Sequence, residues 1–381
     1  FDALAVARER GTEANAVLLG ALAGSGVLPV SVEAFRKAIE HKGVLVASNL
    51  AGFDVGLEIG SSGQAPAAAG AGARPRSQLQ SSLGRAPAPA AASVGGFASD
   101  VESMPEAVRV VVEHAIPRLV EYQSESYARW YLERLRPFLV SGATAPAVAP
   151  IVARYLAVWM TYEDAIRVAQ LKTRLERFER IRRETRARDG VIVVTDFLKP
   201  DLDEIWGVLP HRLVAPFARW AQRRWPHGRP TLGQHVRTTT VAGYLRLWLL
   251  ARLRWLRPIS YRAHEEQGRI ERWLAAVQRC AAVDGALACE VARAAQLVKG
   301  YGDVRRRMVA LFDELVAAAL KAAALEGERG APVATALAAR FRVLVLQGPD
   351  GEAQAVAVAA QALARLEAGD RDGALAPVAA R

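Results

Sequence analysis

The chain has 381 residues, of which 51% are hydrophobic, and this length is enough for two or three domains with a sizeable core. The formal net charge of +11 is almost all arginine, since only six of the 50 basic residues are lysine, and we attribute it to compositional bias more than to a nucleic-acid-binding surface. The sequence lacks HExxH, Gly-x-Ser-x-Gly, Walker and Rossmann patterns and iron–sulfur or zinc spacings of cysteine, so no catalytic residue and no metal ligand is predicted.

Residues 1–60 are predicted to form a small α/β segment. Thr12 is expected to cap a first helix that ends near Ala23, and Ser31 a second helix that ends before Gly43. Residues 44–46 are a short strand candidate. The first helix is apolar nearly all round, which indicates that it is buried on more than one side.

Residues 61–100 are rich in Ala, Gly, Pro and Ser and contain almost no large apolar side chains. Such a composition cannot offset the entropy cost of ordering, so we predict a flexible interdomain linker. A mostly helical domain is expected over residues 101–370, followed by a frayed tail over residues 371–381. The predicted fold class is therefore mainly α, with an incomplete α/β segment at the amino terminus.

The helical domain is predicted to begin with a helix over residues 104–121 that Pro117 interrupts. A helix over residues 124–135, ended by Pro137, follows, and then a long helix over residues 150–188 whose outer face mixes arginine and glutamate. Residues 191–194, four β-formers bounded by Gly190 and Asp196, are the one convincing strand of this part.

Residues 241–256 are predicted to form a buried helix that serves as a central packing element. Its apolar residues recur at helical spacing; they are Val241, Leu245, Trp248, Leu249, Leu253 and Leu256. Thr238, Thr239 and Thr240 offer capping hydroxyls before it, and Pro258 ends it. Arginines that include Arg252, Arg254 and Arg257 rule out a membrane span and are expected to form a solvated basic end.

The remainder, from residue 268, is also predicted to be helical. A Lys-Gly-Tyr-Gly-Asp loop interrupts it, where Gly300 and Gly302 permit positive φ and Asp303 is placed to cap the next helix. That helix is expected to bury Val304, Met308, Leu311, Phe312 and Leu315. Two further helices, near residues 332–347 and 352–368, are joined by a Gly-Pro-Asp-Gly turn.

Two groups of residues are candidate anion-binding sites. Lys299, Gly300, Tyr301 and Gly302 could hold an anionic group with backbone N–H groups beside a lysine, although a simple helix–helix corner explains the same residues. Arg237 with Thr238 and Thr240 stands at a helix start, where ordinary N-capping is the competing explanation.

The tryptophans have two interpretations as well. They could form a stacking surface for nucleic acid. Trp130, Trp159, Trp206, Trp248 and Trp273 mostly fall on apolar helix faces, however, and core packing is the better explanation.

Several motifs resemble one protein family. NAVLLGA (residues 15–21), the Leu28-Pro29 turn, and Asn49 with Phe53 and Gly56 are similar to the end of the gamma-type, Rossmann-like domain of 2-oxoacid:ferredoxin oxidoreductases. Residues 196–210, residues 233–274 and the Lys-Gly-Tyr-Gly-Asp loop resemble the indolepyruvate ferredoxin oxidoreductase beta subunit. Lys199 stands where that family commonly has histidine, which puts any imidazole role there in doubt. The chain begins at Phe1, so the amino-terminal part of the gamma-type domain is expected to be missing.

The resemblance implies an accessory beta subunit in the cytoplasm. The family oxidatively decarboxylates aryl 2-oxoacids such as indolepyruvate to an acyl-CoA and passes the electrons to ferredoxin. Thiamine diphosphate and the 4Fe–4S clusters are expected on a partner alpha subunit, with coenzyme A as co-substrate and no cofactor on this chain, which alone should be inactive. The alternative from another class is a basic helical nucleic-acid-binding or scaffold protein.

Overall fold

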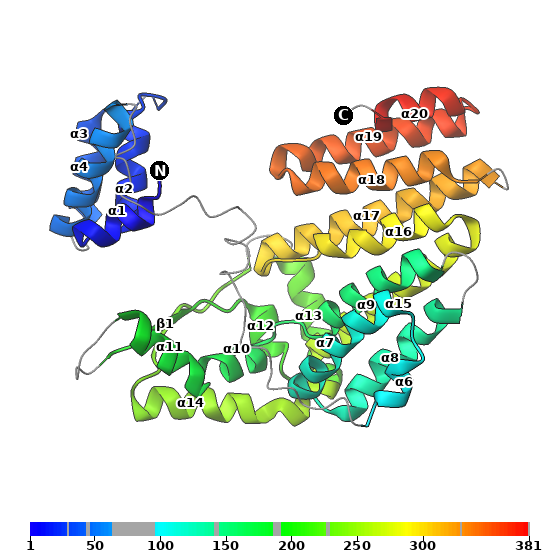
Figure 1. Cartoon of the computed structure of the whole chain (residues 1–381), viewed down its shortest axis with the longest axis horizontal. Helices are drawn as coiled ribbons and strands as arrows, with labels where there is room; N and C mark the ends of the chain where they lie inside the picture. The colour runs from blue at the N-terminus through cyan, green and yellow to red at the C-terminus, as the bar shows by residue number, and fades with distance from the viewer. Residues whose placement is uncertain are drawn as a thin grey trace. The chain divides into compact units, whose positions relative to one another are not determined.

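The computed structural model describes residues 1–28, 30–42, 46–62, 96–140, 145–185, 192–225, 229–327 and 330–379. The chain divides into two units, Phe1–Ala86 and Pro87–Arg381 (Figure 1). The predicted mainly α class is confirmed, because helices make up most of the described residues and the strands there are two short ones. The predicted linker, residues 61–100, lies largely outside the described residues, and helices enter it at both ends.

The described part of the first unit is built from helices alone. They are α1 (Ala3–Arg10), α2 (Ala14–Gly24), α3 (Val32–Lys42) and α4 (Val46–Ser62). The α/β expectation for this segment finds no support there: Val46 opens α4, and residues 44 and 45 lie outside the described part. Ser31 does cap α3, accepting from the Ala34 amide at 3.3 Å. Thr12 does not cap α2, because its hydroxyl donates instead to the carbonyl of Ser48 at 2.6 Å.

Glycines bring α2 and α4 into backbone contact. A Cβ atom at Gly56 would lie 1.9 Å from the Val17 carbonyl oxygen, and one at Gly20 would lie 1.9 Å from that of Phe53. No side chain fits at either position without moving a helix. Glycine at these places is therefore a packing requirement, and it explains the glycines in two of the motifs noted above.

The second unit begins with α6 (Ala98–Glu102), α7 (Glu106–Tyr122), α8 (Glu125–Val140) and α9 (Ala145–Met160). Pro137 does not end α8 as predicted but lies inside it, and Pro117 lies inside α7, which continues past it to Tyr122. A proline removes one hydrogen bond and crowds the preceding turn. Buried residues on both sides of each proline, such as Leu135 and Phe138 in α8, hold the helix in place.

The predicted long helix over residues 150–188 is in fact three. After α9 come α10 (Ala165–Lys172) and α11 (Leu175–Thr185), with breaks at Asp164, which caps α10, and at Thr173. The predicted strand is also displaced. Residues 192–194 are not in a strand, and β1 (Thr195–Leu198) pairs antiparallel with β2 (Gln234–Arg237), a strand that periodicity did not reveal.

The largest difference from the predictions concerns the buried central helix expected over residues 241–256. The segment contains α12 (Leu202–Trp206), α13 (His211–Arg224), α14 (Val241–Arg252) and the 3-10 helix η2 (Leu253–Ile259). Helix α14 packs through Leu247, with Leu250 and Ala251, in a small cluster beside α10. None of the six residues of the predicted stripe is fully buried: Val241, Leu245 and Leu249 are exposed, and Trp248, Leu253 and Leu256 are half-buried. Figure 1 shows α14 along one edge of the second unit.

The carboxyl-terminal half supplies most of the core. It contains α15 (Tyr261–Val283), α16 (Gly285–Arg293), η3 (Ala294–Leu297), α17 (Gly302–Glu326), α18 (Pro332–Leu346), α19 (Pro349–Glu367) and α20 (Arg371–Ala379). The two helices predicted near residues 332–347 and 352–368 are confirmed as α18 and α19. The predicted frayed tail is wrong for its described residues, because α20 buries Ala374 and Val378 against the preceding helices.

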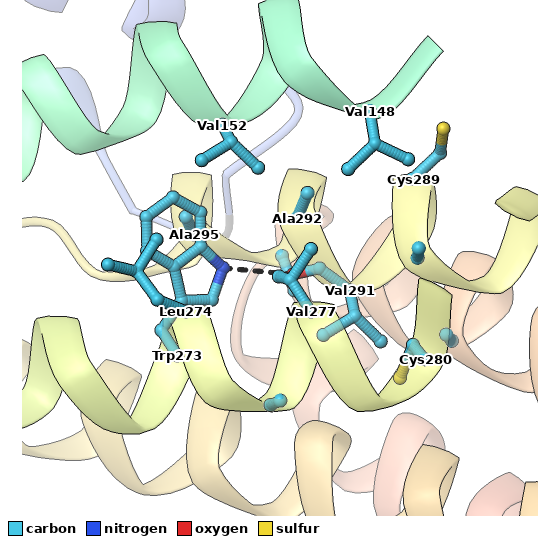
Figure 2. Close-up of a cluster of buried hydrophobic side chains, with 14 of the residues drawn as sticks. Val148, Val152, Trp273, Leu274, Val277, Cys280, Cys289, Val291, Ala292 and Ala295 are labelled. Atoms are coloured by element: carbon cyan, nitrogen blue, oxygen red, sulfur yellow. Dashed lines mark hydrogen bonds between the residues drawn. The ribbon is translucent and has the colours of Figure 1, made fainter. Parts of the chain in front are cut away.

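The main core lies where α7, α8 and α9 meet α15 to α19. Trp273 is fully buried at its centre and donates from Nε1 to the Val291 carbonyl at 3.3 Å (Figure 2). Trp159 packs against it with ring centroids 5.1 Å apart. Core packing is therefore confirmed for these two tryptophans, whereas Trp130 is 37% exposed.

Candidate functional site

The structure places the candidate residues of β2 and α14 in different surroundings. Thr240 is the N-cap of α14, and its hydroxyl accepts from the Gly243 amide at 3.2 Å. Arg237 is exposed at the end of β2, and its carbonyl accepts the Thr240 hydroxyl at 2.8 Å. Thr238 is buried and turned away from the helix start. Thr240 is therefore an ordinary N-cap. Anion binding by Arg237, Thr238 and Thr240 stays a prediction.

Thr238 instead belongs to a buried charge cluster around Asp196. The Asp196 carboxylate accepts from the Thr238 hydroxyl at 3.0 Å, from Lys172 Nζ at 2.6 Å and from Arg177 through both oxygens at 2.9 Å. Burial alone would raise the pKa of Asp196, but the Lys172 hydrogen bond and the Arg177 charge lower it below its ordinary value. The cluster links α10 and the start of α11 to the two-stranded sheet, so it is a structural tie.

A second buried pair joins Arg257 to Asp164. Arg257 Nε lies 2.7 Å from Asp164 Oδ2, and Arg257 Nη1 donates to the Tyr122 carbonyl at 2.6 Å. The same guanidinium lies 4.0 Å from the centroid of the Tyr122 ring. The predicted solvated basic end is therefore wrong for Arg257, which is only 2% exposed. Its partner, the helix cap Asp164, lies far away in the sequence, and helical periodicity gives no signal for it.

The Lys-Gly-Tyr-Gly-Asp loop precedes α17. Gly300 has φ +90° and Gly302 has φ +54°, as predicted for these glycines. Lys299 and Tyr301 are exposed, and a Cβ atom at Gly302 would lie 3.6 Å from Asp201 Oδ2. A carboxylate at that distance disfavours an anion in the loop. Anion binding here stays a prediction, and no hydrogen bond among the described residues joins this loop to the Arg237 group.

The predicted cap at Asp303 is wrong. Tyr301 is the N-cap of α17 and makes no side-chain capping bond, while Asp303 lies within the first turn and pairs with Arg306. A neighbour one turn along the same helix thus pairs with the carboxylate that the local pattern assigned to a cap. The same helix also leaves Val304 49% exposed, contrary to the prediction, although Met308, Leu311, Phe312 and Leu315 are buried.

Three consecutive arginines after this loop tie α17 to three other helices. Arg305 donates to Glu266 of α15 at 2.7 and 2.8 Å, Arg306 to Asp201 and Asp203 beside α12 at 3.0 and 2.9 Å, and Arg307 pairs with Glu352 of α19 at 3.0 Å. The partners of these arginines could not be predicted from the sequence, because the carboxylates are distant in the chain. The segment is a structural junction.

Glu266 is the most heavily paired carboxylate of this junction. It is 3% exposed and contacts Arg262 at 2.8 Å and Arg269 at 2.7 Å in addition to Arg305. Burial by itself would raise the pKa of Glu266, but the charges of Arg262, Arg305 and Arg269 hold it below its ordinary value. These three arginines thus pair inside the fold rather than facing a polyanion.

A cleft of about 580 Å³ lies between α10 and the α14–η2 segment. Its lining contains four arginines, one glutamate and two tryptophans; these are Arg167, Arg174, Arg252, Arg254, Glu121, Trp248 and Trp255. Gln170 also lines it, and the Gln170 amide oxygen is buried without a hydrogen-bond partner in the described part of the chain. The tryptophans and arginines are visible in the sequence, but no local pattern indicates that α10 and α14 meet.

An exposed apolar stripe runs along α13. The buried side of this helix carries the small residues Val214, Ala218 and Ala221, whereas Phe217 is 65% and Trp220 is 57% exposed. Leu213, 68% exposed, continues the stripe one turn earlier. The larger apolar side chains of α13 thus face solvent. A helix that packed only against its own chain would be expected to bury them instead.

The two cysteines offer neither a reactive thiol nor a metal site. Cys280 and Cys289 are buried free thiols, and burial raises the pKa of Cys280 to about 11, which makes its thiol a poor nucleophile. Within the described ranges, no three His, Cys, Asp or Glu side chains group to hold a metal ion. No described helix is long and apolar enough to cross a membrane.

These features define an α-helical protein with arginine–carboxylate junctions, a basic cleft and an exposed apolar helix face. A family model described as a family of unknown function (DUF6537) matches residues 108–318. The match covers more than half of the chain, and the chain belongs to this family. It spans the junction, the cleft and the α13 stripe. No curated protein and no solved structure matches the chain.

Proposed function

We propose that this protein is the accessory beta subunit of a cytoplasmic indolepyruvate or arylpyruvate:ferredoxin oxidoreductase. The complex would convert aryl 2-oxoacids to acyl-CoA and pass electrons to ferredoxin. Thiamine diphosphate and the 4Fe–4S clusters would be held by the alpha subunit. The sequence motifs described above support this assignment, and the α13 stripe supplies the observation that carries the subunit role.

The stripe is suited to a permanent protein partner. Leu213, Phe217 and Trp220 recur at helical spacing on one face, and aromatic residues of this kind form the energetic centre of protein interfaces. Covering a large apolar side chain contributes roughly 1.5–3 kcal/mol. A helix that leaves three of them in water while burying smaller residues fits a surface that the alpha subunit covers.

Co-expression with the thiamine diphosphate-containing alpha subunit tests this assignment by size-exclusion chromatography. The wild-type chain should elute with the alpha subunit. The double variant Phe217→Ser with Trp220→Ser should elute separately, because losing both contacts removes roughly 3–6 kcal/mol, at least about a hundredfold in Kd. Its thermal unfolding midpoint should not fall, since both side chains are exposed.

The matched control is Val343→Ser with Leu346→Ser on α18, two positions that are 40% and 42% exposed. This control should bind the alpha subunit like the wild type. Binding of the α13 variant at wild-type strength, or no binding by the wild-type chain, would contradict the proposal.

The alternative is a basic helical nucleic-acid-binding or scaffold protein, and its nucleic-acid-binding form has a separate test. Binding to nucleic acid would have to fall steeply with salt, because counterions are released from the phosphates. The arginines committed to Asp164, Asp196 and Glu266 leave fewer cations for such a surface.

A further inference from the structure

The cleft between α10 and the α14–η2 segment has more positive charge than the nearby negative groups neutralise. Glu121 receives both Arg167 and Arg174 on one carboxylate oxygen, so it neutralises only one of them. The carboxyl ends of α10 and α14 also lie here, and each contributes about half a negative charge. The four arginines therefore keep an excess of about two positive charges after these compensations.

Two of the arginines are available to a ligand. Arg252 and Arg254 form no ion pair within the described part of the chain, and the Arg252 guanidinium lies 4.6 Å from the Trp248 ring centroid. A guanidinium stacked on an indole keeps its N–H donors in a fixed plane, the geometry that suits phosphate oxygens. The charge excess and the free donors together favour a dianionic group such as a diphosphate.

The other lining residues favour a planar ring beside that group. Trp255 is 69% exposed although it lines the cleft, so its indole face is open for stacking. The buried, unpartnered amide oxygen of Gln170 needs an N–H or O–H donor, since a polar atom left unpaired in a folded protein is unfavourable. An amino-substituted heterocycle offers both a stacking face and that donor.

We propose that this cleft binds a nucleotide of the nucleoside diphosphate class. Arg252 and Arg254 bind the phosphates, Trp255 stacks on the base, and Gln170 accepts from its amino group. The volume of about 580 Å³ is within the range of sites for single small molecules, roughly 300–1,000 Å³. A single nucleotide therefore matches the size of this open cleft, and the oligothymidylate probe below distinguishes it from a continuous strand. The inference is independent of the oxidoreductase assignment.

Isothermal titration of the full chain tests the proposal, with ADP, adenosine, pyrophosphate and a short oligothymidylate as probes. ADP should bind saturably, and adenosine, which lacks the phosphates, should bind about tenfold more weakly or worse. The double variant Arg252→Gln with Arg254→Gln should lose about tenfold or more in ADP affinity. Trp255→Ala should weaken ADP binding and leave pyrophosphate binding unchanged.

The double variant Arg272→Gln with Arg279→Gln changes two exposed arginines of α15 that do not line the cleft; it is the charge-matched control and should bind ADP like the wild type. Circular dichroism melting confirms that each variant is folded. Three results would overturn the proposal: no saturable ADP binding, equal ADP affinity in the wild type and the double arginine variant, or tighter binding of oligothymidylate than of ADP.

Discussion

Glu266 shows how single buried charges organise this fold. One carboxylate is shared by Arg262, Arg269 and Arg305, so its attraction offsets part of the repulsion among three like charges in one junction. Isolated buried ion pairs often add little net stability, but removing one partner leaves the others uncompensated. Because Glu266 has three arginine partners, its removal should cost more than the loss of an ordinary pair.

We therefore expect Glu266→Gln to destabilise the second unit by about 3–5 kcal/mol. The amide keeps the shape of the side chain but removes the charge that holds the three guanidiniums together. Chemical denaturation followed by circular dichroism measures the change. The neighbouring Glu265→Gln, at an exposed position, should shift stability by less than about 0.5 kcal/mol. Equal effects of the two substitutions would show that the junction contributes nothing to stability.

The lowered pKa of Glu266 also predicts a pH dependence. A carboxyl whose folded-state pKa lies below its unfolded-state value stabilises the fold above the unfolded pKa, about 4.3 for glutamate, and loses this contribution as the pH falls through the folded value. The stability difference between wild type and Glu266→Gln should therefore be full at pH 6 and shrink below about pH 4. A difference that stays constant, or grows, on acidification would contradict this assignment.

Among the elements, α14 shows where helical periodicity stops being informative. The helix carries large apolar side chains on two faces, and the pattern alone selects the wrong one. Val241, Leu245 and Leu249 are exposed, and Leu247 is buried because α10 and β2 lie on that side. Which face is covered depends on a tertiary neighbour that is distant in the sequence.

Local signals succeeded where a side chain acts on its own backbone. The caps at Ser31 and Thr240, the positive φ of Gly300 and Gly302 and the turn before α19 all follow from short-range chemistry. Signals failed where tertiary contacts compete. Thr12 bonds to Ser48 rather than to its own helix, whereas at Asp303 a neighbour on the same helix, Arg306, pairs with the carboxylate.

The pair α2 and α4 leads to a second stability prediction. Gly56→Ala would place a methyl group 1.9 Å from the Val17 carbonyl oxygen, so the two helices must separate. We expect a loss of about 1–3 kcal/mol or more, as for other overpacked interfaces. Hydrogen exchange of α2 amides localises the effect to the first unit.

The control for this change is Gly268→Ala in the interior of α15, where the nearest atom to the new methyl group is a flexible arginine end at 3.5 Å. Removing a helix glycine there should be neutral or stabilising by up to about 1 kcal/mol. Faster exchange in α2 is expected only for Gly56→Ala. Unchanged α2 protection in that variant would mean that the close approach of the helices does not exist.

At the scale of the whole chain, the mainly helical class could be predicted from the sequence, but the two functional surfaces could not. The cleft and the α13 stripe depend on which faces tertiary packing leaves uncovered, and composition does not encode that choice. The arginine abundance was attributed to compositional bias, and the structure gives many of these arginines buried carboxylate partners. Oxidoreductase membership rests on motifs and stays a proposal.

Dye reduction tests the proposed subunit role most directly. The chain, the alpha subunit and their mixture are each supplied with indolepyruvate, coenzyme A and a viologen dye. The mixture should reduce the dye faster than the alpha subunit does, the chain alone should not reduce it, and the double variant Phe217→Ser with Trp220→Ser should lose the gain. Dye reduction by the chain alone, or a rate for the alpha subunit that the chain does not change, would contradict the accessory-subunit assignment.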